Sequence, residues 1–249
     1  MPHNVTSKCE DIASQLVHSI TGKNLNVILG GGRREFLSEN ITDEENSIGK
    51  RKDERNLIHE WSTTRGTNKV QYVWNRNDLN NVQADTEYLL GLFESNHCRY
   101  HLDAADEDPS LLEMTEAAIK ILSKGSDGYF LFVEGGRIDH AHHDTQAQKA
   151  LDEAVELSKA VQRARELTSR EDTLIIVTSD HAHTMTVSGY SERGNDIFGV
   201  AGKGDDELPY TTLSYANGPS YRKEVNGSRY NVSDDDRSKC TTIRLFSRI

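Results

Sequence analysis

The 249-residue sequence has few cysteines, no long apolar run and no excess of basic residues. Its three cysteines are an odd number, so at least one of them is free or lacks its partner. No apolar run approaches the roughly 18 residues that a membrane-spanning helix needs. Asp and Glu together number 40, against 29 for Lys and Arg, and the net charge of -11 argues against nucleic acid as a partner.

Four Asn-x-Ser/Thr sequons favour a glycoprotein of the secretory pathway. They lie at Asn4, Asn40, Asn226 and Asn231. The opening residues, MPHNVTSK, are polar and do not form a signal sequence. Because sequons without a signal suggest that the natural N-terminus lies upstream, we expect the sequence to be a fragment or a truncated form.

Strand-like and helix-like stretches alternate along the chain, which predicts an α/β fold with a largely parallel sheet. The apolar spacing predicts helices over residues 11–20, 57–64, 109–124 and 145–169. Strands are predicted over residues 24–29, 70–74, 129–133 and 174–177, with a short strand-like piece at 213–215. Gly30, Gly31 and Gly32 predict a tight strand-to-helix turn, and residues 38–54 predict a loop.

Carboxylates and imidazoles follow two of the predicted strands, in the blocks FLFVEGGRIDHAHHD and LIIVTSDHAH. The residues concerned are Glu134, Asp139, His143, Asp180, His181 and His183. Open α/β sheets build their sites at the carboxyl ends of strands. Catalytic zinc uses carboxylate and imidazole ligands with an open position. Two such blocks predict two metal ions, which can clamp the attacking and leaving oxygens of a phosphoryl transfer.

The spacing within the first block predicts which side chains face the site. Asp139 and His143 are four residues apart and therefore share one face of a helix that begins near them. Two preceding glycines let the backbone turn, so that Glu134 can face the same cavity. His140 and His142 are expected to point elsewhere, as surface residues or as supports of the ligands.

The chain resembles the animal alkaline phosphatases from Cys9 to about Gly218. The matching stretches are CEDIASQL, NVILGGGRREF, YVWNR, GLFE, DPSLLEMTEAA, FLFVEGGRIDHAHHD, LTSREDTLIIVTSDHAH and GYSERGNDIFG. The resemblance implies a three-layer α/β/α sandwich that is incomplete at both ends. Residues 1–188 would be part of the catalytic domain, residues 189–236 a truncated crown-like segment, and residues 237–249 a tail without a family counterpart.

The resemblance also implies two zinc ions and one magnesium ion. Asp139 and His143 would bind the first zinc, and Asp180 and His181 the second. Glu134 would bind the magnesium ion. His183 would form a hydrogen bond with Asp139 and fix its orientation.

A calcium ion is implied in addition. Its ligands would match Glu45, the carbonyl of Phe93, Glu94 and Asp108. Hard oxygen ligands suit calcium. The alternative is that the acidic residues from 103 to 108 form a solvated loop.

The implied activity is hydrolysis of phosphate monoesters through a phosphoseryl intermediate. The family's nucleophilic serine stands in an Asp-Ser-Ala motif, which the 249 residues do not contain, and His183 is the last histidine. We therefore expect this chain to be inactive as it stands. The complete enzyme would be a homodimer in the extracellular space or at the cell surface, with a glycosylphosphatidylinositol-type membrane anchor. Neither a signal nor an anchor is visible in these residues.

Three alternatives stay open. The first is a catalytically inactive family member that still binds zinc. The second is a phosphodiesterase or sulfatase of the wider metallo-hydrolase superfamily, although the run VEGGRIDH with Glu134 argues against it. The third is a purely structural protein, which the clustered ligands at two strand ends disfavour.

Overall fold

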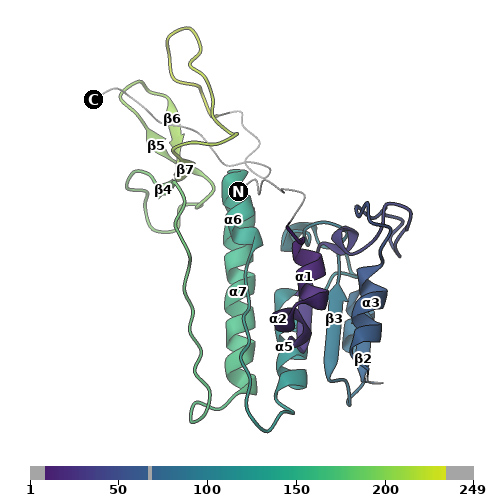
Figure 1. The fold of residues 1–249 in the computed structure, drawn as a ribbon. Coiled ribbons are helices and arrows are strands. Elements are labelled where there is room, and N and C mark those ends of the chain that lie inside the picture. The colour runs from purple at the N-terminus through teal and green to yellow at the C-terminus, as the bar shows by residue number, and fades with distance from the viewer. Residues whose placement is uncertain (1–8, 67–68, 234–249) are drawn as a thin grey trace. The chain divides into compact units, whose positions relative to one another are not determined.

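The computed structural model describes residues 9–66 and 69–233 of the chain. They form two compact units, and Figure 1 labels most of their helices and strands. The first unit comprises the described residues up to 99, residues 103–133 and residues 160–168. The second comprises residues 100–102, 134–159 and the described residues from 169 onward. The sequon at Asn4 and the predicted tail over residues 237–249 lie outside the described residues.

A three-stranded parallel sheet lies in the first unit, in the order β1 (Val27–Gly30), β3 (Tyr88–Leu92), β2 (Val70–Val73). The strands predicted over residues 24–29 and 70–74 are confirmed, with small shifts at their ends. The central strand β3 is not predicted, because its sequence YLLGL lacks the alternation of apolar and polar residues. Its residues Leu89 and Leu90 are fully buried, as expected for a strand covered on both faces of a parallel sheet.

The helices of this unit are α1 (Ile12–His18), α2 (Ile20–Lys23), α3 (Leu57–Thr64), α4 (Arg76–Asn80) and α5 (Leu111–Leu122). The helices predicted over residues 57–64 and 109–124 are confirmed as α3 and α5. A reciprocal capping box between Ser110 and Glu113 fixes the start of α5. The single helix predicted over residues 11–20 is interrupted, because the Ser19 hydroxyl accepts a hydrogen bond from the N–H of Gly22 and begins α2.

Two apolar clusters cover the two faces of this sheet. Successive side chains of a strand point to opposite faces, so Leu90 and Leu92 belong to one cluster and Leu89 to the other. The buried members of the first are Ala13, Val17, Phe36, Leu57, Trp61, Leu90 and Leu92; those of the second are Val73, Leu79, Leu89, Phe93 and Ile121. The core of the unit therefore depends on β3 more than on any predicted strand.

The three consecutive glycines lie where β1 ends. Gly32 has a φ of +86°, and the 3-10 helix η1 (Arg33–Glu35) follows it, so the predicted strand-to-helix turn is confirmed. A Cβ on Gly31 would lie 2.3 Å from the carbonyl oxygen of Asn96, whereas one on Gly30 would meet no atom within 4 Å. The run thus permits a left-handed turn and a close approach of two backbone segments.

The second unit contains helix α6 (Arg137–His143) and the beginning of the long helix α7 (Ala147–Leu167). Helix α7 confirms the helix predicted over residues 145–169, and its last residues belong to the first unit. Strand β4 (Met185–Val187) pairs antiparallel with β7 (Leu213–Tyr215), and β5 (Val200–Lys203) with β6 (Pro209–Thr211). A second 3-10 helix, η2, spans His101–Asp103. In residues 9–66 and 69–233, no helix has both the length and the apolar character that a membrane span requires.

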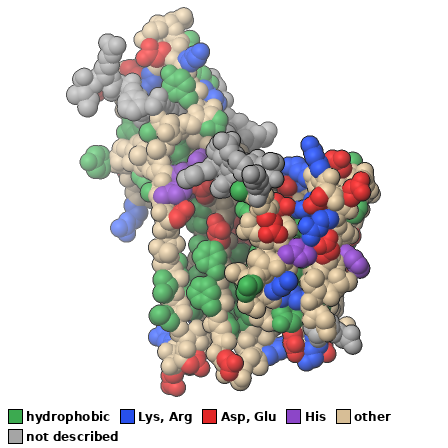
Figure 2. All heavy atoms as spheres, in the orientation of Figure 1, with side chains coloured by type: hydrophobic (Ala, Val, Ile, Leu, Met, Phe, Trp, Pro, Cys, Tyr) green, Lys and Arg blue, Asp and Glu red, His purple; other side chains and the backbone are tan. Residues whose placement is uncertain are grey.

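The strands predicted over residues 129–133 and 174–177 are wrong: neither segment is a strand in the structure. Their large apolar side chains are exposed, with Phe130 at 88%, Phe132 at 75%, Leu174 at 83% and Ile176 at 76%. Figure 2 shows apolar side chains exposed at the surface. A run of apolar and β-branched residues suits a buried strand. A strand also needs a neighbouring strand to satisfy its backbone hydrogen bonds, and no described residue forms a strand pair with these segments.

Candidate metal centre

Helix α6 carries two of the predicted ligands on one face. Asp139 and His143 are one turn apart, and Nε2 of His143 lies 3.4 Å from Oδ1 of Asp139. On the opposite side of the helix, the fully buried Ala141 packs with Tyr100 and with Ala150 of α7. This small apolar contact holds the helix while the ligand face stays accessible.

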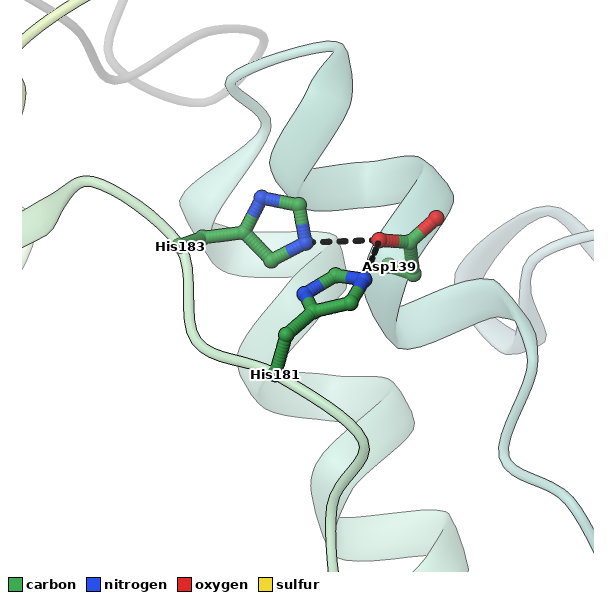
Figure 3. Close-up of side chains that lie close together, drawn as sticks. All are labelled: Asp139, His181 and His183. Atoms are coloured by element: carbon green, nitrogen blue, oxygen red, sulfur yellow. Dashed lines mark hydrogen bonds and ion pairs between the residues drawn. The ribbon is translucent and has the colours of Figure 1, made fainter. Parts of the chain in front are cut away.

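The segment before β4 brings two histidines to Asp139. Nε2 of His183 lies 2.7 Å from Oδ1 of Asp139, and Nε2 of His181 lies 3.5 Å from the same oxygen. Figure 3 shows both imidazoles turned toward this carboxylate. One potential ligand atom from each of the three residues lies within 4.8 Å of the others. The hydrogen bond expected between His183 and Asp139 is therefore present.

The electrostatics of this cluster keep Asp139 ionised. Partial burial acts to raise the pKa of its carboxyl group. The hydrogen bond from His183 and the nearby imidazoles of His143 and His181 outweigh burial, so the pKa lies below its ordinary value. An ionised carboxylate beside two imidazoles is a suitable donor set for a divalent cation.

The remaining predicted ligands of zinc and magnesium do not join this three-residue cluster. The Asp180 side chain is 86% exposed, and its Oδ2 lies 3.5 Å from Nε2 of His181. Glu134 is exposed, and its carboxylate lies close to Gly136. The structure therefore groups Asp139 with His181 and His183, whereas the family resemblance pairs Asp139 with His143 and Asp180 with His181. The metal assigned to each residue stays a prediction.

His142 contacts His183, as expected for a residue that supports the ligands and not for a surface residue. Its ring stacks on that of His183, with centroids 4.8 Å apart and an angle of 23° between the planes. Its Nδ1 lies 2.8 Å from the hydroxyl oxygen of Tyr215 on β7. The sequence provides no signal for Tyr215, because only the pairing of β4 with β7 brings it near the histidines.

The carboxylates of the predicted calcium site lie around the Arg99 guanidinium group in the first unit, and Glu45 also forms an ion pair with the buried Arg33. Nε of Arg99 lies 2.6 Å from Oε1 of Glu94, and its terminal nitrogens lie 3.7 Å from Oδ2 of Asp108 and 4.0 Å from Oε1 of Glu45. Burial, followed by the charges of Glu45 and Asp108, raises the pKa of Glu94. Asp108 is buried, and this contradicts the solvated-loop alternative for that residue. Phe93 is also buried.

One carboxylate oxygen of Glu94 lacks a hydrogen-bond partner in this arrangement, among the residues that the structure describes. Its Oε1 is buried and close to Arg99, yet no described donor makes a well-directed hydrogen bond to it. The two observations agree if the contact is a Coulombic pair in which the N–H group points past the oxygen. A buried carboxylate oxygen of this kind could accept a cation.

Comparison with known proteins identifies the family. The family description "alkaline phosphatase" matches residues 1–249. The membrane-bound alkaline phosphatase of Bombyx mori is 46% identical, and the match covers 94% of this chain and 43% of that protein. The tissue-nonspecific alkaline phosphatase isozyme of Felis catus is 47% identical, and the match covers 93% of this chain and 46% of that protein. The crystal structure of Thermus thermophilus alkaline phosphatase has a TM-score of 0.56 and 31% identity, covering 67% of this chain and 33% of that one. The chain thus spans about half the length of its curated relatives, and it belongs to the alkaline phosphatase family of hydrolases.

Proposed function

We propose that this chain supplies metal-binding residues to a phosphomonoesterase site. The observation that carries the proposal is the cluster of Asp139, His181 and His183. Carboxylate oxygens and imidazole nitrogens are donors that zinc accepts, and His183 holds Asp139 in place through its hydrogen bond. His181 is half exposed, which leaves the cluster open on one side.

The residues of the chain have distinct tasks in this proposal. Asp139 supplies a negative charge, which its lowered pKa maintains at neutral pH. His143 lies within reach of the same carboxylate and offers a further nitrogen. When bound, zinc would act as a Lewis acid on a phosphoryl oxygen. We assign Asp139 and His143 to a first zinc and Asp180 and His181 to a second, with Glu134 as a ligand of magnesium.

Mutation of Asp139 tests the metal centre. We expect the chain to bind zinc, and Asp139→Ala to weaken binding at least about tenfold, because the substitution removes the only carboxylate of the cluster. Competition with a chromophoric chelator measures the dissociation constant. His59→Ala is the matched control, since it removes an exposed histidine from α3. Equal zinc affinity of Asp139→Ala and the unmodified chain would place the metal elsewhere.

A calcium site formed by Glu45, the carbonyl of Phe93, Glu94 and Asp108 is a second part of the proposal. Three carboxylates around one arginine, with a poorly satisfied oxygen on Glu94, support it. Oxygen ligands of this kind suit calcium. Since Arg99 lies among these carboxylates, the arginine and calcium would compete for them.

Removal of this competing charge should strengthen calcium binding. We expect Arg99→Gln to raise calcium affinity about tenfold, because each of the ion pairs that must break contributes up to about 1 kcal/mol. Terbium luminescence with calcium competition measures the change. Arg163→Gln serves as a control, since Arg163 pairs with Glu116 and Glu166 outside this cluster. Lower calcium affinity of Arg99→Gln would show that the arginine supports the site.

The relatives also suggest a proposal for the substrate, the oligomeric state and the location of the complete enzyme. The substrates would be phosphate monoesters, and the complete enzyme would act as a homodimer at the cell surface or outside the cell. One relative is described as membrane-bound. The sequon residues Asn40, Asn226 and Asn231 are exposed, which supports glycosylation. Residues 189–236 would belong to a crown-like segment of the complete enzyme.

A further inference from the structure

His142 occupies the space between a proposed metal-site residue and a buried tyrosine. On one side its ring lies over His183, with 4.8 Å between the ring centroids. On the other side its Nδ1 and the Tyr215 hydroxyl are 2.8 Å apart. The Tyr215 and His142 rings also meet edge to face, with centroids 5.8 Å apart. His142 therefore has two directional contacts, and each restricts the rotation of its ring.

The Tyr215 hydroxyl is a hydrogen-bond donor in this contact. Burial raises the pKa of Tyr215 to about 12, so its hydroxyl keeps its proton. Such a hydroxyl can donate a hydrogen bond to Nδ1 of His142.

Tyr215 is itself a rigid support. It is 2% exposed and packs with Ala147 and Leu213. Its backbone pairs with Met185 on β4, only two residues after His183. The β4–β7 pair thus restrains His183 twice, once through the backbone of the following strand and once through the ring of His142.

We propose that His142 and Tyr215 are positioning residues that hold the His183 imidazole against Asp139. The inference rests on the proposed metal centre, since it assumes that the orientation of Asp139 and His183 matters for binding a cation. Groups that orient metal-binding side chains in this way strongly affect metal affinity. His142 would thereby act on the metal through another residue and not as a ligand.

Zinc titration of substituted chains tests the inference. His142→Ala should weaken zinc binding by about 10-fold to 100-fold, the range observed when such supporting groups are removed. Tyr215→Phe removes only the hydroxyl and should weaken it about threefold to tenfold, the equivalent of one hydrogen bond. His142→Asn, which keeps an acceptor near the Nδ1 position, should recover part of the loss. Cobalt(II) absorption should also change in each variant that weakens zinc binding.

Thermal unfolding of the metal-free chains separates positioning from general stability. Tyr215→Phe leaves the buried ring in place, so its unfolding midpoint should stay close to that of the unmodified chain while its zinc affinity falls. His59→Ala should change neither quantity. Zinc affinity and cobalt spectra that are unchanged in both Tyr215→Phe and His142→Ala would overturn this inference alone. Absence of zinc binding by the unmodified chain would overturn the proposed metal centre and this inference together.

Discussion

The 249-residue polypeptide should hydrolyse p-nitrophenyl phosphate no faster than a buffer control at alkaline pH with added zinc and magnesium. Its sequence contains no Asp-Ser-Ala, the motif in which the resemblance places the nucleophilic serine. Loss of a covalent nucleophile alone costs about six orders of magnitude in a serine hydrolase. The proposed metal centre would polarise a phosphate group, but it would not replace that nucleophile.

The assay needs a positive control and a variant that reports on the site. A full-length alkaline phosphatase measured at equal molarity sets the scale of the expected deficit. Asp139→Ala distinguishes turnover at the proposed site from contamination, because contaminating activity would not respond to it. Turnover well above background that disappears in Asp139→Ala would contradict the expectation and would require another nucleophile in these residues.

Two leucines, one in β3 and one in the segment 174–177 that the sequence predicts as a strand, should respond very differently to substitution. Leu90→Ala should lower the free energy of unfolding by about 2 to 5 kcal/mol, the usual cost of removing a buried leucine side chain. Leu90 is fully buried in β3 and contributes to the larger apolar cluster of the first unit. Leu174→Ala makes the same chemical change at a side chain that is 83% exposed. Its effect should stay within about 0.5 kcal/mol.

Chemical denaturation, followed by fluorescence of the fully buried Trp61, measures the first of these changes directly. Trp61 belongs to the same apolar cluster as Leu90 and therefore reports on its disruption. Circular dichroism should accompany the fluorescence measurement for Leu174→Ala, because Leu174 lies in the other unit. A loss of several kcal/mol on Leu174→Ala would mean that residues 174–177 are buried in solution, as their apolar sequence predicts.

Elements with strong local signals could be predicted from the sequence. Helix α5 has a capping box and an apolar face, and α3 has the side chain of Asn56 at its start. The spacing of Asp139 and His143 likewise predicts their shared face on α6, since that relation depends on helix geometry alone. These features require no knowledge of distant residues.

Features that depend on distant partners could not be predicted. Residues 129–133 and 174–177 have the composition of buried strands, but composition does not show whether a neighbouring strand is present. Similarly, the contact of His142 with Tyr215 arises because β4 pairs with β7, and it joins residues 73 positions apart. The hydrogen bond of His183 to Asp139 is expected only through the family resemblance, since helix spacing does not reach the second block.

The three glycines at the end of β1 have a consequence for how the family can evolve. A Cβ at position 30 would meet only open space, so selection on the fold leaves this position free to drift to alanine or serine. Position 31 faces the backbone carbonyl of Asn96, and position 32 has a left-handed backbone, so both should resist replacement across lineages. The fold therefore constrains Gly31 and Gly32 more strongly than Gly30. Among homologues, we expect substitutions at the first glycine of the run before the other two.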